Sequence, residues 1–388
     1  MLRLRLGLTL SLSGFRIGSL IITSLLLLVA LAPQASTQAQ APAQAVITQD
    51  NLPQSQRLEG LRLVWQDINR CSAAALTIQL SYYMTFTDLS GAYNEVVRQL
   101  NPRLSDASVR IEEMGALAEA QGLGSIVRRG GTVELLKQLV ANGFPVLIEN
   151  VYYDGPNGWN DWMSHNRVLM GYDDAVNEFY FYDPLRGAGQ NAQGYAMTYD
   201  DVAQRWRPFN YDYLVLYRPE EEAKLQEVLG AQWDAAYNAQ WTLSLAQAEI
   251  DSGNADSFTY FNRGWAELQL DLYEDAAASF DRALSMGLPW RMLWYEFGPF
   301  EAYLEVGRYD DVIREVRRTI AGLPEIAISP ELNVEISIEE LYYYIAQAYL
   351  GQGNTERAIA NLDAALYRKP NFIEARELMD SLTGGTNS

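Results

Sequence analysis

The stretch WQDINRCSAAALTIQLSYY, residues 65–83, decides the fold of the N-terminal half and contains the sole cysteine, Cys71. The residues after Cys71 are mostly small or apolar, which predicts a buried helix over Cys71–Tyr83. Asn69 is suited to the N-cap and places Cys71 in the first turn. The free N–H groups and positive dipole end of that turn favour a thiolate, which is the nucleophilic form of cysteine.

From this helix to about residue 219, the sequence contains both helical and strand patterns. Helical periodicity covers Val109–Gln121 and Thr132–Asn142. Short β-branched and aromatic runs bounded by Gly, Asp or Pro predict four strands, at Pro145–Glu149, Arg167–Tyr172, Glu178–Asp183 and Tyr213–Tyr217. Helices followed by antiparallel strands predict an α+β domain over residues 52–219.

The sole histidine, His165, lies just before the second predicted strand. If the second and third strands form an antiparallel hairpin, His165 and Asp183 lie at the same end of it. An Asp in that place orients the imidazole and stabilises its protonated form, as in a catalytic triad. Gln66 enters the same helix as Cys71 and supplies an amide donor for an oxyanion. Together these residue types are typical of an acyl-transfer enzyme.

Residues 60–218 resemble the papain-like cysteine peptidases of the bacteriocin-leader-processing group, the peptidase family C-39-like proteins. The matching motifs, besides the Gln before the Cys, are Gly143-Phe144-Pro145-Val146, Ser164-His165, Gly171-Tyr172-Asp173-Asp174 and Asp183-Pro184. The resemblance implies that Gln66 is the oxyanion donor, Cys71 the nucleophile, His165 the general base and acid, and Asp183 the orienting residue. Ser72-Ala73 replaces the usual Gly-Pro after the nucleophile, so we expect reduced or altered activity.

Residues 223–382 carry a repeating pattern of amphipathic helices. This part resembles the tetratricopeptide repeat, a helix pair of about 34 residues, so we expect an all-α repeat domain. The middle copy departs from the pattern because Phe300 occupies a small-residue position. The repeats are expected either to engage a polypeptide on their concave face or to support the first domain. The recurring positions are Tyr260, Gly264, Ala276, Phe280 and Ala283, then Tyr342, Ala346, Ala358, Leu362 and Ala365.

The first 46 residues have the organisation of an export signal. Three arginines precede the apolar stretch Ile17–Ala32, and a run of Ala, Gln, Pro, Ser and Thr follows at Pro33–Ala45. Cleavage of this segment would give a secreted protein, and its retention would tether the chain to a membrane. No Cys lies directly after the apolar stretch, which excludes lipoprotein processing. At the other end, residues 383–388 are expected to form a flexible tail.

Composition excludes several classes of function. The chain has 29 basic and 49 acidic residues and a net charge of −20, which argues against nucleic acid as a partner. One Cys and one His exclude an internal disulfide framework and the usual Cys/His zinc cluster. Asp173 and Asp174 are common turn residues, so neither they nor Asp183 predict a metal site. We expect no cofactor.

Two interpretations of function stay open on the sequence. The first is an exported cysteine peptidase that hydrolyses an amide bond through Cys71, His165 and Asp183, with repeats that engage a polypeptide substrate or protein partner. The second is a catalytically weak or inactive domain that acts with the repeats as an extracytoplasmic interaction scaffold. The aromatic loop Tyr152–Trp162 either walls a substrate groove or packs on itself.

Overall fold

The computed structural model describes residues 46–103, 106–152, 162–289, 291–321, 336 and 338–384. Val46–Ser388 is one compact unit. The predicted export segment up to residue 45 and the end of the expected tail, from residue 385, lie outside the described residues. Within the described part of the chain, no helix has both the length and the apolar character needed to cross a membrane.

The N-terminal half is built on an antiparallel sheet in the order β2-β7-β3-β4-β5-β6, with β1 paired to β4. The central strand β3 is buried at every position, because helices cover both faces of the sheet. The strands are β1 (Ser55–Arg57), β2 (Gly124–Arg128), β3 (Val146–Tyr152), β4 (Met163–Asp173), β5 (Glu178–Tyr182), β6 (Tyr195–Thr198) and β7 (Tyr213–Tyr217).

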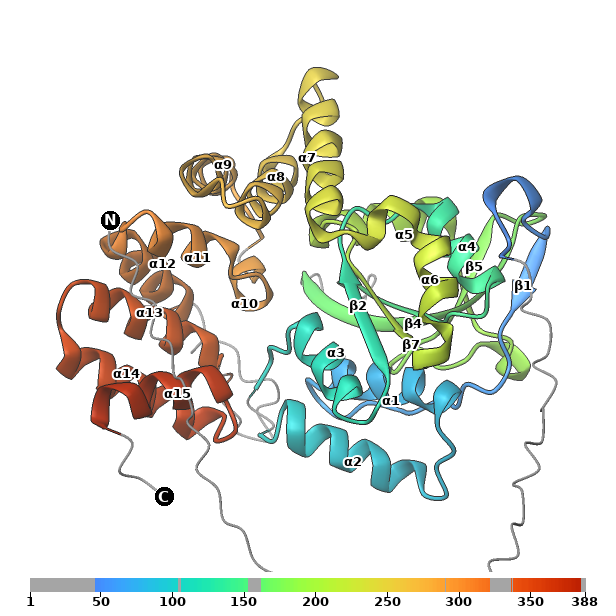
Figure 1. The fold of residues 1–388 in the computed structure, drawn as a ribbon, viewed down its shortest axis with the longest axis horizontal. Coiled ribbons are helices and arrows are strands. Elements are labelled where there is room, and N and C mark those ends of the chain that lie inside the picture. The colour runs from blue at the N-terminus through green and yellow to red at the C-terminus, as the bar shows by residue number, and fades with distance from the viewer. Residues whose placement is uncertain are drawn as a thin grey trace, which may run out of the picture. The chain divides into compact units, whose positions relative to one another are not determined.

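Helices α1 to α3 lie on one side of this sheet and α4 to α6 on the other (Figure 1). Helix α1 is buried along ten consecutive residues, so its one long polar side chain there must be paired. The Gln79 side chain meets this need by donating to the carbonyls of Pro145 and Leu214, both at 3.0 Å. The helices are α1 (Cys71–Tyr83), α2 (Leu89–Leu100), α3 (Ile111–Glu119), α4 (Val133–Ala141), α5 (Tyr199–Trp206) and α6 (Glu222–Leu229).

The prediction of an α+β domain is confirmed, with some differences in detail. The predicted hairpin is β4 and β5, which pair antiparallel from Asp173 opposite Glu178 to Val168 opposite Tyr182. His165 lies inside β4 because this strand begins two residues earlier, at Met163. Asp183 follows β5 and makes a two-way backbone bridge with Gly187, which closes a tight turn at this end of the hairpin.

The C-terminal half is all helical, as the repeat pattern predicted (Figure 1). Three consecutive pairs pack together: α8 with α9, α11 with α12, and α13 with α14. The helices are α7 (Ala235–Asp251), α8 (Ser257–Gln269), α9 (Tyr273–Met286), α10 (Met292–Tyr295), α11 (Gly298–Glu305), α12 (Tyr309–Ala321), α13 (Glu339–Gly351), α14 (Thr355–Arg368) and α15 (Ile373–Thr383).

Small residues in the repeats face large ones across each helix pair. A Cβ atom added to Gly264 of α8 would lie 2.8 Å from the Phe280 ring of α9, so only glycine fits there. In the later pair the equivalent residues, Ala346 and Leu362, are both fully buried. Each helix pair therefore fills the space between its helices with one small and one large side chain. The first copy uses Gly opposite Phe, and the later copy uses Ala opposite Leu.

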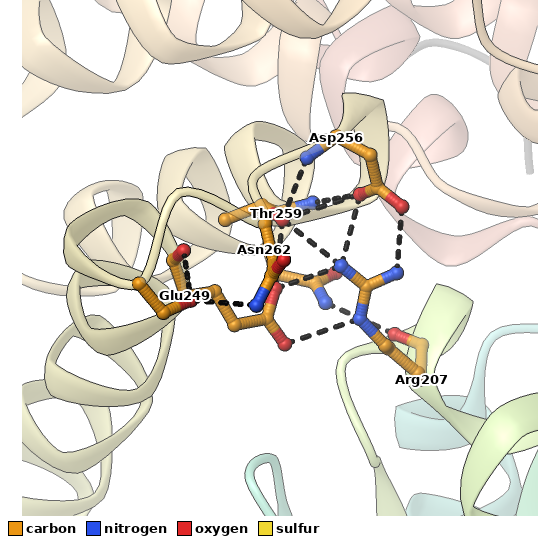
Figure 2. Close-up of polar contacts among 7 residues, drawn as sticks. Arg207, Glu249, Asp256, Thr259 and Asn262 are labelled. Carbon is orange, nitrogen blue, oxygen red and sulfur yellow. Dashed lines mark hydrogen bonds and ion pairs between the residues drawn. The ribbon is translucent and has the colours of Figure 1, made fainter.

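Arg207, at the end of α5, connects the two halves of the chain (Figure 2). Its guanidinium donates to both carboxylate oxygens of Glu249 in α7, at 2.7 and 3.1 Å, and to both of Asp256, at 2.9 Å. Asp256 is also the N-cap of α8 and accepts from the backbone N–H of Thr259. The Arg207 carbonyl accepts from the Asn262 side chain at 2.9 Å. This network holds the start of the repeats against the sheet domain.

An Arg207→Ala variant is expected to lower the free energy of unfolding by about 1.5–3 kcal/mol, because it removes several charge-assisted hydrogen bonds from a half-buried site. Urea unfolding followed by circular dichroism measures this loss. The control is Arg98→Ala, which removes an exposed surface pair with Glu95 and should leave the free energy of unfolding nearly unchanged. Equal losses in the two variants would contradict the role given to Arg207.

Candidate active site

Cys71 is the first residue of α1 and is partly exposed. The N-cap is Arg70, so the prediction that Asn69 caps this helix was wrong by one residue. Asn69 instead has a φ of +59°, a left-handed conformation that its short polar side chain tolerates. The Asn69 carbonyl accepts from the Asn101 side chain at 3.0 Å, which holds this turn in place. Cys71 lies in the first turn of the helix, as predicted.

His165 and Asp183 form a buried hydrogen-bonded pair beside this turn. His165 Nε2 lies 2.8 Å from Asp183 Oδ1, and the two residues are 3% and 0% exposed. The same carboxylate oxygen accepts from the backbone N–H groups of Leu185 and Arg186, at 2.8 and 2.9 Å. Because the turn after β5 supplies these two donors, the backbone fixes where the carboxylate stands. Asp183 in turn orients the imidazole.

Cys71 and His165 line the same cavity, where the imidazole stabilises the charge of the thiolate. With Nε2 engaged by Asp183, Nδ1 is the ring nitrogen left for the sulfur. Burial alone would raise the pKa of the Cys71 thiol, but the hydrogen bond and charge of His165 outweigh it, and this pKa lies below its ordinary value. Burial likewise opposes charge on His165, yet Asp183 raises the pKa of the imidazole above its ordinary value. Both shifts favour a thiolate–imidazolium pair.

Arg167 is a component of this site that the sequence analysis missed. It lies two residues after His165 on β4, and its Nη2 atom is 3.5 Å from Asp183 Oδ2. Burial would raise the pKa of Asp183, but the charges of His165 and Arg167 lower it well below its ordinary value. Asp183 is therefore the anion of the group. Alternation along a strand places residues i and i+2 on one face, which is the signal that could have found Arg167.

Gln66 lines the same small cavity of about 80 Å³ as Cys71 and His165. Its backbone N–H donates to the Pro184 carbonyl at 3.1 Å, so the segment before α1 is attached next to Asp183. The structure therefore brings all four predicted site residues into one place. Ser72 is buried within α1, and its Oγ lies 4.0 Å from the Cys71 sulfur. A helical position accepts a serine without strain, so this departure from Gly-Pro leaves the backbone at Cys71 undistorted.

The repeat half contributes a wall of this cavity, which the sequence analysis also missed. Arg291, Trp294 and Tyr295, in and next to α10, line it together with Ile336. Tyr152 of β3 also lines the cavity, and the centre of its ring lies 5.4 Å from the centre of the His165 ring. The middle of the predicted aromatic loop, residues 153–161, lies outside the described residues. The site is thus a shared one, with its reactive groups from the sheet domain and part of its cover from the repeats.

Comparison with known families agrees with this geometry. The model of the Peptidase_C39 like family matches residues 47–213, which include Gln66, Cys71, His165 and Asp183. Residues 47–213 therefore match a C39-like peptidase domain. A tetratricopeptide repeat model matches residues 339–372, which cover α13 and α14. The C39-like domain followed by helical repeats is therefore the organisation that the sequence predicted.

Several solved structures are similar to parts of this chain. A protein described as a C39-like peptidase from Bacillus anthracis is 15% identical, covers 42% of this chain and 98% of its own, and has a TM-score of 0.32. A double glycine motif protease from an AMS/PCAT transporter, solved in complex with the leader peptide, is 17% identical. It covers 42% of this chain and 98% of its own, with a TM-score of 0.29. The MamA RS-1 ArsTM double mutant is 14% identical, covers 44% of this chain and 85% of its own, and has a TM-score of 0.30. No curated protein matches the chain.

Proposed function

We propose that this protein is an exported cysteine peptidase that hydrolyses amide bonds in a polypeptide. The observation that carries the proposal is the hydrogen-bonded Asp183–His165 pair, whose imidazole lines one cavity with the Cys71 thiol at a helix N-terminus. Hydrogen bonding and charge favour the ionised thiol there against the opposing effect of burial, and the thiolate is the form that attacks a carbonyl. A buried structural cysteine needs none of these partners.

In the proposed reaction the Cys71 thiolate attacks the carbonyl carbon of the scissile amide. Negative charge then develops on the carbonyl oxygen, where the Gln66 side-chain amide and the N–H groups at the start of α1 stabilise it. His165 gives its proton to the leaving amine as the C–N bond breaks, which leaves an acyl-enzyme. His165 then removes a proton from water, and the hydroxyl group displaces Cys71 and releases the acid. Asp183 holds the imidazole in place throughout.

The place of action is part of the proposal. The basic and apolar N-terminal sequence supports export, with the chain either released or tethered through residues 17–32. The repeats support contact with a polypeptide, since a tetratricopeptide unit is a common protein-binding element and α10 already reaches the cavity of Cys71.

Incubation of the protein with a mixture of unfolded polypeptides tests the proposed activity. Mass spectrometry of newly formed peptide termini should show cleavage by the wild type and a loss of at least about 100-fold in Cys71→Ser, since the serine lacks a low-pKa thiol. Cleavage that persists in Cys71→Ser would contradict the mechanism. Partner binding that survives in Cys71→Ser, with no cleavage by the wild type, would favour the scaffold interpretation instead.

A further inference from the structure

A second cavity, of about 230 Å³, adjoins the cavity of Cys71. The two share Glu149 of β3 and Tyr295 of α10 as lining residues. The second cavity in turn shares Arg110 and Glu301 with a larger one, of about 400 Å³, among α8, α11, α13 and α15 of the repeats. Three neighbouring cavities, each sharing lining residues with the next, therefore lie between the repeats and the nucleophile.

The second cavity holds more acids than bases. Its lining has two basic residues, and both already have carboxylate partners. Arg110 lies 2.8 Å from Glu374 and 3.4 Å from Glu113, and Arg129 lies 3.5 Å from Glu112. The lining acids therefore exceed the cations available to them among the described residues. The acids are Glu112, Glu149, Asp212, Glu296 and Glu301.

Asp212 gives independent reason to expect a ligand here. It is 1% exposed, and its Oδ1 accepts from the backbone N–H of Glu149 at 3.3 Å. Its Oδ2 atom is buried and has no hydrogen-bond partner among the described residues. Leaving a buried carboxylate oxygen unpaired is costly, so such an oxygen on a cavity wall marks the place of a missing donor.

The protonation of these acids agrees with a missing cation. Burial raises the pKa of Glu296 to about 7. Burial together with neighbouring carboxylates raises the pKa of Glu149 and of Asp212 well above the ordinary range. Arg129 lowers the pKa of Glu296 and of Asp212, but burial and the neighbouring carboxylates outweigh this single cation. A guanidinium or ammonium group placed among them would favour their ionised form and bind through charge-assisted hydrogen bonds.

We propose that the cavity lined by Glu149, Asp212 and Glu296 is a specificity subsite that takes a Lys or Arg side chain of the polypeptide substrate. This inference rests on the proposed peptidase function. The cavity is smaller than the roughly 300–1,000 Å³ of a pocket for a drug-sized molecule, and its size suits a single long side chain. Its position next to Cys71 makes it a subsite for a residue close to the cleaved bond.

A binding comparison of two isosteric compounds tests the subsite without any turnover. We choose N-acetyl-arginine methylamide and N-acetyl-citrulline methylamide, titrated by calorimetry into full-length Cys71→Ser protein. Citrulline keeps the shape of arginine but carries no charge, so the arginine compound should bind at least about ten-fold more tightly. Combined Asp212→Asn and Glu296→Gln substitutions keep side-chain size and should remove this preference. The exposed-acid variant Glu134→Gln should retain it.

Equal affinity for the two compounds, or no binding of either, would overturn the proposed subsite. This comparison uses Cys71→Ser protein with an intact cavity, so it does not depend on whether a cavity variant folds. Survival of the arginine preference in the folded double variant would overturn the assignment of residues. Failure of the proposed peptidase function gives a different result. In that case Cys71 of the wild type would not react as a low-pKa thiol, whatever the two compounds do.

Discussion

An Asp183→Ala variant is expected to lose roughly 10²- to 10⁴-fold of amide hydrolysis, the range that general acid–base catalysis contributes. Asp183 is the hydrogen-bond partner of His165 Nε2 at 2.8 Å, and it raises the pKa of the imidazole. Without the carboxylate, His165 loses both its fixed orientation and the support for its protonated form. The Cys71 thiolate then loses its counter-ion. Steady-state hydrolysis of a peptide found by the cleavage screen measures this effect.

The same substitution is expected to destabilise the fold by about 3–5 kcal/mol, because it leaves the Arg167 guanidinium buried without its anion. Asp183→Asn separates the loss of charge from the loss of the hydrogen-bond acceptor. Its side-chain oxygen can still accept from Leu185, Arg186 and His165, so the imidazole keeps its orientation, while Arg167 loses its anion as it does in Asp183→Ala. We expect its activity to lie between those of the wild type and Asp183→Ala. A folded Asp183→Ala variant with wild-type activity would contradict the role of Asp183.

The second large effect is expected at Lys369, which is 3% exposed and follows α14. Its Nζ atom lies 2.9 Å from Glu113 of α3 and 3.1 Å from Glu339 of α13. Asp106 and Glu340 are also buried, and both are close enough to raise the pKa of Lys369. Lys369→Met keeps the length of the side chain but removes the cation. We expect the free energy of unfolding to fall by about 3–5 kcal/mol near pH 8.

The pH dependence of this loss has a defined sign. Burial raises the pKa of Asp106 and Glu340 well above the ordinary range, and Lys369 opposes that rise. Removal of Lys369 therefore raises both pKa values further, and the variant recovers stability as the pH falls and the acids take up protons. Urea unfolding at pH 8 and pH 5 measures the difference. The control Lys137→Met removes one partly exposed pair with Asp174 and should cost about 1 kcal/mol or less.

The parts of the fold that the sequence predicted well depend on strong local patterns. Helix α1 has the predicted bounds because its small and apolar residues run without interruption from Ser72 to Ile78. The β4–β5 hairpin followed from two aromatic, β-branched runs separated by a short polar turn. Strand β2 was missed because Gly124 and Ser125 weaken its pattern and only Ile126 is fully buried. Its place in the sheet comes from pairing with β7, which is a non-local contact.

The site residues likewise fall into those that local patterns predicted and those that only non-local packing brings together. His165 and Asp183 could be placed together because one hairpin connects them, and Cys71 because a helix begins there. The roles of Arg291, Trp294 and Tyr295 at the cavity could not be predicted, since they lie between two repeat pairs and reach Cys71 only through packing of the two halves. Asp212 and Glu149 were overlooked for a similar reason. Their meeting depends on the adjacency of β3 and β7 in the sheet.

The measurement that tests the central claim most directly is the rate at which neutral iodoacetamide alkylates Cys71, followed from about pH 4 to 10. Cys71 is the sole cysteine, so the signal comes from one thiol. A thiolate paired with His165 predicts a fast rate that is already present well below the ordinary thiol pKa of about 8.5. In His165→Ala that low-pH reaction should disappear. A single rise near pH 8.5 in both proteins would contradict the account.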